Sequence, residues 1–416
     1  MIVKRTAIIL LYVSIFLMLA PPSLRLPQNM LEIGPVILYY FELPLILSYL
    51  LAFFILIKEK RVYGKRTFVV YGFFTAIAVI GFVGALLYAK TSYTTVLLDC
   101  RPIVYWLSGI IVAIAGGRYI KLKTLSWVVI AGLAAEFLLA IILTTYVTSL
   151  RDPYEFRMPG RSGWLILFVA SIPLMMFTHR EKLKKVGKYS ILPTAAVTGL
   201  LLVNVVMVKN RTTWVVLFIL AVIWLVFYAP FSRNVKVVLL IPVILVVAWQ
   251  GLQYVPVTRR AVRALPVKQF TSRLSRESLG TIWRCNREVI YKSNVRDFKK
   301  RPVFGNGFGH EMYFDFSNYC KNPDRASTSS DNSYMNVLVK TGIAGLVCFA
   351  IALFLIYSRM RKALSQTKPV EEWLYLQSMV FAFPFFLLMG LNIAILFSYP
   401  EVIIFSLFLS KSDQVH

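Results

Sequence analysis

The chain has 416 residues, of which 58% are hydrophobic and 16% are charged. An average soluble domain is less apolar and more charged, so this composition indicates that lipid is the solvent for most of the chain. The formal net charge of +27 would suit a nucleic-acid-binding protein, but the Lys and Arg residues form short clusters between apolar runs. That pattern excludes one basic soluble domain and favours membrane topology and an anionic substrate as reasons for the charge.

About twelve apolar segments are predicted to be transmembrane helices, because each holds roughly 20 mostly apolar residues, the length that crosses a bilayer. They lie near residues 6–20, 33–57, 68–88, 96–115, 125–148, 162–177, 190–208, 213–230, 236–254, 334–357, 374–394 and 395–410. The first segment also fits a signal peptide, with Lys4 and Arg5 before a short apolar run, although Pro21 and Pro22 follow where a cleavage site needs small residues. The sequence therefore predicts an all-α integral membrane protein.

The basic residues between these segments orient the chain. With a cytoplasmic N-terminus, 22 Lys or Arg residues fall in cytoplasmic segments and seven fall in the short loops on the opposite side. Cytoplasmic loops accumulate Lys and Arg. Both termini are therefore predicted to be cytoplasmic.

Residues 255–333 form the one long hydrophilic stretch of the sequence. Nine predicted spans separate them from the cytoplasmic N-terminus, so they are predicted to lie on the opposite side of the membrane, which we call the outside. The predicted organisation is spans one to nine in 1–254, the outside loop in 255–333, and spans ten to twelve in 334–416. The loop carries fifteen Lys or Arg residues, and long loops are exempt from the positive-inside rule. Its charge indicates either attraction to anionic lipid headgroups or an anionic ligand, and both alternatives stay open at this point.

Two of the four cysteines, Cys285 and Cys320, lie in this outside loop, whereas Cys100 and Cys348 lie in or near spans. Outside the cytoplasm two thiols in one loop can oxidise. A disulfide between Cys285 and Cys320 is therefore a hypothesis, which peptide maps with and without reductant would test.

Arginines stand where outside loops run into predicted helices. Arg211 precedes the eighth span, and Arg157 and Arg161 precede the sixth. The N-terminal end of a helix presents free N–H groups and partial positive charge, and a guanidinium beside it completes an anion site. The alternative is that these arginines extend to the lipid headgroups.

Acidic residues in the spans need partners, because an ionised carboxylate is costly in lipid. Glu42 and Glu136 lie inside predicted spans and indicate helix–helix contacts or a polar cavity. Asp99 and Arg101, at the outer end of the fourth span, are expected to pair with each other.

The long loop ends in Asp331 and Asn332, directly before the tenth span. Asp, Asn and Ser before an apolar helix are ordinary N-caps. Capping does not exclude catalysis, since an Asp at a helix N-terminus amid arginines stays ionised and can accept a proton from an attacking hydroxyl.

A Gly-x-Gly-x-Gly run stands earlier in the loop and includes Gly305 and Gly307. Such a run lets the backbone approach a ligand closely, although no Walker lysine follows it. His310 comes directly after the run and is the only histidine predicted to lie outside.

Several short motifs follow one another along the chain, and all are predicted to lie on the outside of the membrane or next to it. In chain order they are Arg157 with Gly160; Arg211 before Thr212 and Trp214; Trp283; Arg301-Pro302-Val303-Phe304-Gly305-Asn306-Gly307-Phe308-Gly309; Asp331-Asn332-Ser333-Tyr334; and Val339-Lys340-Thr341-Gly342-Ile343-Ala344-Gly345. Together they resemble the O-antigen ligase and O-antigen polymerase superfamily over about residues 157–346.

This resemblance implies a GT-C-like fold with a partly helical periplasmic loop, in the inner membrane of a bacterium. It implies a metal-independent inverting glycosyltransferase whose donor is a glycan on undecaprenyl pyrophosphate. A ligase moves the glycan to lipid A-core, and a polymerase moves it to the next lipid-linked repeat unit. No cofactor is expected, because arginines can balance the charge of the leaving pyrophosphate.

The resemblance also implies roles for single residues. The residues expected to bind the pyrophosphate and substrate are Arg157, Arg211, Arg284, Arg287, Gly305 and Gly307. Asp331 is expected to be the base or to orient the acceptor, together with Asn332, and His310 is its possible substitute. Ligases similar to this chain carry His where Asp331 stands, whereas polymerases more often tolerate Asp, which favours the polymerase.

Other classes of protein predict other features. An exporter or flippase of lipid-linked saccharides would place charged residues at mid-membrane and show two related halves, and the sequence shows no such repeat. A purely structural membrane protein is the third class. The expected partners are the lipid-linked oligosaccharide, a glycan acceptor and the bilayer, and nucleic acid is not expected.

Overall fold

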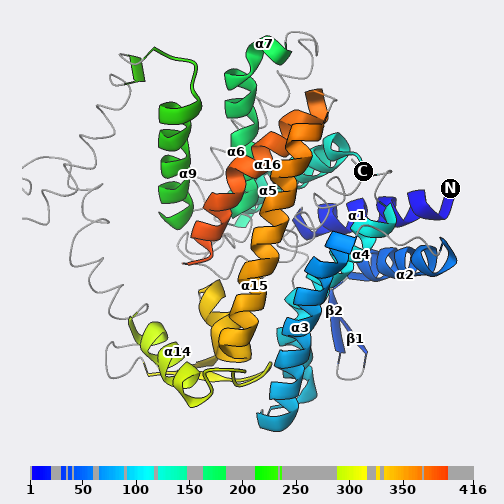
Figure 1. Cartoon of the computed structure of the whole chain (residues 1–416), viewed down its shortest axis with the longest axis vertical. Helices are drawn as coiled ribbons and strands as arrows, with labels where there is room; N and C mark the ends of the chain where they lie inside the picture. Colours follow the sequence, from blue (N-terminus) through cyan, green and yellow to red (C-terminus); the bar gives the residue numbers. More distant parts are fainter. Residues whose placement is uncertain are drawn as a thin grey trace, which may run out of the picture.

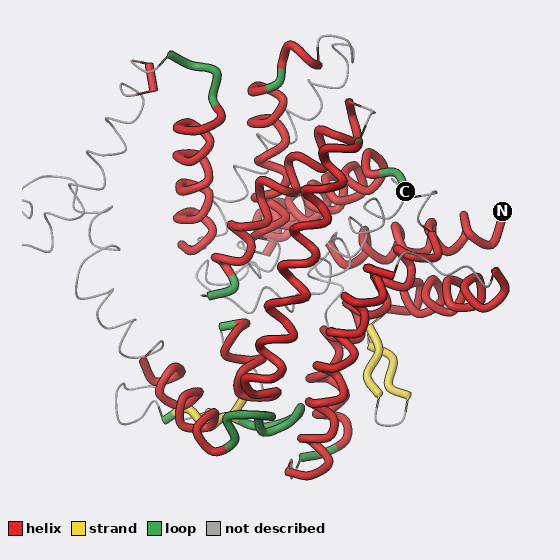
Figure 2. Tube along the Cα trace, in the orientation of Figure 1, coloured by secondary structure: helices red, strands yellow, loops and turns green. Residues whose placement is uncertain are grey.

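The computed structural model describes residues 2–19, 30–33, 36–39, 42–59, 65–88, 91–116, 120–147, 163–183, 211–232, 235–236, 288–315, 325–327, 332–367 and 370–391. The helices in these ranges are α1 (Ile2–Leu19), α2 (Glu42–Glu59), α3 (Lys65–Tyr88), α4 (Tyr93–Gly116), α5 (Leu122–Val147), α6 (Gly163–Thr178), α7 (Arg180–Leu183), α9 (Arg211–Ile223), α14 (Val289–Lys300), α15 (Ser333–Gln366) and α16 (Val370–Met389), with a π-helical turn, η7 (Trp224–Tyr228), after α9. The described part of the chain is thus mostly helical (Figures 1 and 2).

Four helices among the described residues are long and apolar enough to cross a membrane. They cover Thr67–Tyr88, Tyr93–Ala115, Ser333–Gln366 and Glu372–Met389. This finding agrees with an all-α membrane protein, whereas the expectation of twelve spans stays a prediction. Shorter apolar helices lie at Leu122–Ala135, Leu167–Thr178 and Val216–Tyr228.

The second predicted span, 33–57, begins differently from the expectation. Strands β1 (Met30–Ile33) and β2 (Val36–Tyr39) pair in antiparallel register, and α2 begins only at Glu42. The sequence between the strands is Gly34-Pro35, a dipeptide typical of turns that cannot continue a helix. In Figure 1, α1 and α2 run across the direction of α3 and α15.

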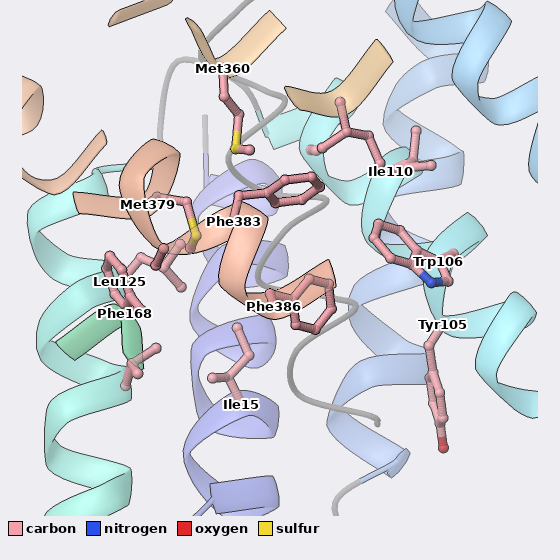
Figure 3. Packing of buried hydrophobic residues seen from close by; sticks show 14 of the residues in the cluster. Ile15, Tyr105, Trp106, Ile110, Leu125, Phe168, Met360, Met379, Phe383 and Phe386 are labelled. Atoms are coloured by element: carbon pink, nitrogen blue, oxygen red, sulfur yellow. The ribbon is translucent and has the colours of Figure 1, made fainter. Parts of the chain in front are cut away.

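Large apolar side chains fill the space between the helices (Figure 3). Phe74 of α3 stacks on Trp106 of α4 with ring centroids 4.6 Å apart, and Phe349 of α15 meets the same Phe74 edge to face. Lipid is as apolar as these side chains, so close packing, rather than removal from water, holds such helices together. Hydroxyl groups add links between helices, such as that from Ser171 Oγ of α6 to the carbonyl of Ser378 of α16, at 2.9 Å.

The predicted outside loop contains regular structure and a small core of its own. Helix α14 packs on strand β3 (Met312–Phe314), which pairs in antiparallel register with β4 (Arg325–Ser327). The apolar side chains of this core are Val289, Ile290, Met312, Phe314 and Val339. Because Val339 belongs to α15, this part of the loop is fixed to a spanning helix.

Candidate functional site

The glycine-rich turn of residues 301–309 and the break in α15 lie at one end of the molecule, which we call the loop end because α14, β3 and β4 lie there (Figure 1). The C-terminal end of α3 and the N-terminal ends of α6 and α9 point toward this end, as Figure 1 shows. The helix α9 begins at Arg211, as the sequence predicted. The N-terminal end of α9, with its first N–H groups, is therefore directed toward the loop end.

Helix α15 is broken at Gly342 close to the loop end. Gly342 has φ 65° and ψ −166°, so two helical segments meet there at a sharp change of direction. A Cβ at this position would lie 2.2 Å from the carbonyl oxygen of Val303. Only glycine combines this backbone conformation with so close an approach.

The break leaves carbonyl groups of the first segment without their helical partners, and the glycine-rich loop supplies new ones. In a continuous helix the carbonyls of Val339 and Lys340 would accept from the N–H groups four residues further on. Here the N–H of Asn306 donates to Val339 and the N–H of Gly307 donates to Lys340, both at 2.9 Å.

The same exchange satisfies the first N–H groups of the second segment. Ile343 donates to the carbonyl of Pro302 at 2.9 Å, and Ala344 donates to that of Val303 at 3.1 Å. Two carbonyls and two N–H groups freed by the break thus find partners in residues 302–307. These replacements stabilise the break, because an unpaired buried backbone group costs several kcal/mol.

The remaining N–H groups of the Gly-x-Gly-x-Gly run are also engaged. Gly305 donates to the carbonyl of Arg301, Phe308 donates to that of Gly81 in α3, and Gly309 donates to Asp99 Oδ2 in α4 at 2.8 Å. The run is therefore held by helices, and its N–H groups are not free to hold an anion. A role of Gly305 and Gly307 in binding substrate stays a prediction.

Close packing explains why glycine stands at these positions. Gly305 and Gly307 have φ of 72° and 88°. A Cβ on Gly307 would lie 2.1 Å from the backbone nitrogen of Ala85 in α3, and one on Gly305 would lie 2.4 Å from the carbonyl carbon of Lys340. The backbone approach that the pattern predicts is therefore made to two helices of the same chain.

A buried ion pair fastens the loop to two spans. Lys340 of α15 bonds to Asp99 Oδ1 of α4, and the other carboxylate oxygen accepts the N–H of Gly309. The two side chains are only 8% and 7% exposed. A buried charge pair is tolerated when its further hydrogen-bonding capacity is met, and the Gly309 N–H contributes to that.

The expected pairing of Asp99 with Arg101 is not what the structure shows. Arg101 Nε instead lies 3.4 Å from Glu42 Oε1 of α2, and the Tyr105 hydroxyl donates to the same oxygen. Residues two apart on a helix point to different faces, which explains the exchange of partners. The prediction that Glu42 needs a partner is confirmed.

His310 lies against a buried carboxylate of α14. Its Nε2 is 3.4 Å from Asp297 Oδ2, and Lys300 Nζ is 2.7 Å from Oδ1 of the same carboxylate. Burial alone would raise the pKa of Asp297, but the nearby His310 and the hydrogen bond from Lys300 outweigh it and lower the pKa to about 2. Asp297 is thus ionised at neutral pH and lies close to the imidazole of His310.

Asn332 acts as the N-cap of α15, so the capping expected at this point is confirmed. Its side-chain oxygen accepts from the N–H groups of Tyr334 and Met335, at 2.9 and 3.1 Å. Its amide donates to the carbonyl of Leu391, beyond the end of α16, at 2.8 Å. These hydrogen bonds of the Asn332 side chain join α15 to the end of α16, whereas His310 lies against α14.

Several predicted site residues lie outside the described residues. They are Asp331, Arg157, Arg161, Arg284, Arg287, Cys285 and Cys320, and the side chains of Arg211 and Glu136 also lie outside the description. Two residues for which the sequence predicted no role make ion pairs at the loop end, namely Asp297 and the motif residue Lys340. Lys340 carried a signal, because a lysine in an apolar span is expected to have a partner.

The fold and the loop end define a mostly helical membrane protein with a structured loop fixed to its spans. Residues 196–350 match a family model described as O-antigen ligase. This match confirms the resemblance to the O-antigen ligase and polymerase superfamily, and it covers α9, α14, the glycine-rich loop and the break in α15. No curated protein matches the chain.

Proposed function

We propose that this chain is a bacterial inner-membrane glycosyltransferase that acts at the periplasmic face on undecaprenyl-pyrophosphate-linked glycans. We favour a polymerase, which adds the glycan to another lipid-linked repeat unit, over a ligase, which transfers it to lipid A-core. The observation that carries the proposal is the family match over 196–350, which includes the helix start at Arg211 and the capped start of α15.

In this proposal arginines hold the leaving group. Arg211, Arg157 and Arg284 or Arg287 bind the pyrophosphate, since guanidinium groups match phosphate oxygens in bidentate geometry. They balance the negative charge that develops on the leaving oxygen, so that the glycosidic bond to the phosphate breaks as the acceptor hydroxyl attacks. Attack from the opposite face of the sugar inverts the anomeric centre.

The acceptor hydroxyl needs a base. Asp331 precedes the N-cap Asn332 and takes this proton, because the N-terminal end of α15 keeps a carboxylate ionised. His310 is the alternative base, and the ionised Asp297, 3.4 Å from its Nε2, would stabilise the imidazolium that forms when it takes the proton. Asp331→Ala and His310→Ala, compared in one transfer assay, separate the two.

The proposal is tested first at Arg211. Arg211→Ala removes a charge-assisted contact and is expected to lower glycosyl transfer by about tenfold to a hundredfold, so that surface polysaccharide is lost while the protein still folds. Lys209→Ala, two residues earlier, is the matched control and is expected to keep the polysaccharide. Polysaccharide of normal chain length on a gel from the Arg211→Ala strain would contradict the assignment.

A second experiment separates polymerase from ligase. Purified protein is incubated with a lipid-linked repeat unit, with and without lipid A-core. A polymerase lengthens the lipid-linked chain without lipid A-core, whereas a ligase gives a new product only when lipid A-core is present.

A further inference from the structure

The turn of residues 301–304 exposes apolar side chains beside a buried loop. Val303 is 55% exposed and Phe304 is 60% exposed, whereas Phe308, four residues further on, is only 4% exposed. Both apolar side chains therefore point away from the packed interior.

The turn is held rigidly in this position. The carbonyls of Pro302 and Val303 accept from the second segment of α15, and the carbonyl of Arg301 accepts from Gly305 at 3.0 Å. The exposure of Val303 and Phe304 is therefore built into the backbone and does not depend on a mobile loop.

Arg301 places a cation at the start of the same turn. Its guanidinium carbon lies 3.4 Å from the centroid of the Tyr88 ring, at the end of α3. Within the part of the chain that the structure describes, no carboxylate pairs with Arg301, whereas Arg296 and Lys300 of the neighbouring α14 both contact Asp297. Stacking on an aromatic ring leaves the N–H edges of a guanidinium available for an anion.

The apolar side of the turn continues the outward face of the spans. Along α15 the exposed apolar residues include Ile343 at 50%, Val347 at 49% and Phe354 at 67%, whose spacing places them along one side of the helix. Val303 adjoins this stripe through the hydrogen bond to Ala344. Apolar residues on the outward face of a spanning helix contact lipid chains.

We propose that this turn binds the polyprenyl pyrophosphate carrier, with the pyrophosphate on Arg301 and the isoprenoid chain along Val303, Phe304 and the stripe of α15. A cation next to an exposed apolar surface at the outer end of the spans matches a lipid with an anionic head and a long apolar tail. The inference rests on the proposed function, because it adds a binding site for the donor of that reaction.

The test measures binding rather than glycosyl transfer, so that it succeeds or fails independently of the proposed activity. The full chain is held in nanodiscs of phosphatidylcholine, and the binding of labelled undecaprenyl pyrophosphate and of inorganic pyrophosphate is measured at equilibrium. Arg301→Gln is expected to weaken both ligands by about tenfold or more. Phe304→Ser is expected to weaken only the prenyl ligand, by about fivefold to tenfold, the loss from one buried apolar side chain.

Two matched controls come from α14. Lys299→Gln removes the same charge from an exposed position two residues away, and Tyr291→Ser removes an aromatic side chain that is 58% exposed, close to the exposure of Phe304. Both control variants are expected to change the affinity by less than about twofold, well below the tenfold loss expected for Arg301→Gln.

Three outcomes would overturn the proposal. The first is that Arg301→Gln lowers the affinity for the two ligands no more than Lys299→Gln does. The second is that Phe304→Ser lowers the affinity for inorganic pyrophosphate as much as the affinity for the prenyl ligand. The third is competition by phosphatidylglycerol as strong as that by unlabelled carrier, which would assign the turn to bulk lipid. If Arg301→Gln does not fold, Arg301→Lys replaces it, and unchanged affinity for pyrophosphate in a folded Arg301→Lys protein counts against the proposal, since lysine lacks the bidentate edge.

Discussion

Gly307 offers the sharpest test of how the glycine-rich loop is held. Its φ of 88° would cost an alanine about 1–2 kcal/mol. The new Cβ would also lie 2.1 Å from the nitrogen of Ala85, so α3 and the loop would have to separate, which adds about 1–3 kcal/mol of overpacking. Gly307→Ala is therefore expected to destabilise the protein by about 2–5 kcal/mol.

The measurement is thermal unfolding of the purified chain in detergent, followed by the fluorescence of its eight tryptophans. The midpoint is expected to fall by roughly 2–6 °C, because the unfolding entropy of a 416-residue chain is about 0.9 kcal/mol/K. Gly72→Ala is the matched control, because Gly72 lies in α3 with nothing within 4 Å of an added Cβ, and alanine there is expected to stabilise by about 0.5–1 kcal/mol. A midpoint for Gly307→Ala that equals or exceeds the unmodified value would refute the reasoning.

Three further changes test the other contacts of the loop end. Lys340→Met leaves Asp99 buried without its partner and is expected to cost about 3–5 kcal/mol, while adding Asp99→Leu restores part of that loss; a double variant less stable than the single one in thermal unfolding would contradict this. The low pKa of Asp297 means that its contribution to stability is complete above the ordinary carboxyl value of 3.8 and disappears as the pH falls toward about 2. The stability difference between the unmodified chain and Asp297→Asn should shrink across that window, and a difference that stays constant there would rule the pairing out. Asn332→Ala removes the N-cap of α15 and is expected to cost about 0.5–2 kcal/mol, whereas Asn332→Asp keeps the cap and is expected to remain within about 0.5 kcal/mol of the original.

Local signals in the sequence predicted local structure well. The helix start at Arg211 and the cap at Asn332 depend on a few neighbouring residues, and both are confirmed. The partner requirement of Glu42 is also confirmed, because the cost of a lone carboxylate in lipid depends little on the rest of the fold.

Contacts between distant residues were beyond such signals. Asp99 and Lys340 are 241 positions apart, and the residues around each of them do not indicate that the two form a pair. The sequence therefore favoured the nearby Arg101 as the partner of Asp99, and this prediction was wrong. The glycine run shows a similar limit. Its pattern predicts that something approaches the backbone closely, but the pattern is the same whether that neighbour is a ligand or a helix.

The break in the helix at Gly342 was not predicted from the sequence, for a physical reason. A single glycine inside an apolar run is tolerated in a helix at a cost of about 1 kcal/mol. The helix stops there because residues 302–307 offer hydrogen bonds that replace those lost. That compensation comes from another part of the chain and is invisible in the run itself.

The one-for-one exchange of backbone partners at Gly342 has a consequence for engineering and for recombination between related chains. Residues 302–307 and 339–344 complete each other, so neither can be transplanted alone. A chimera whose imported loop follows another backbone path would leave two carbonyls and two N–H groups of α15 without these partners, each at a cost of several kcal/mol when buried. Exchanges of segments between related chains should therefore move α14, the glycine-rich turn and the first segment of α15 together.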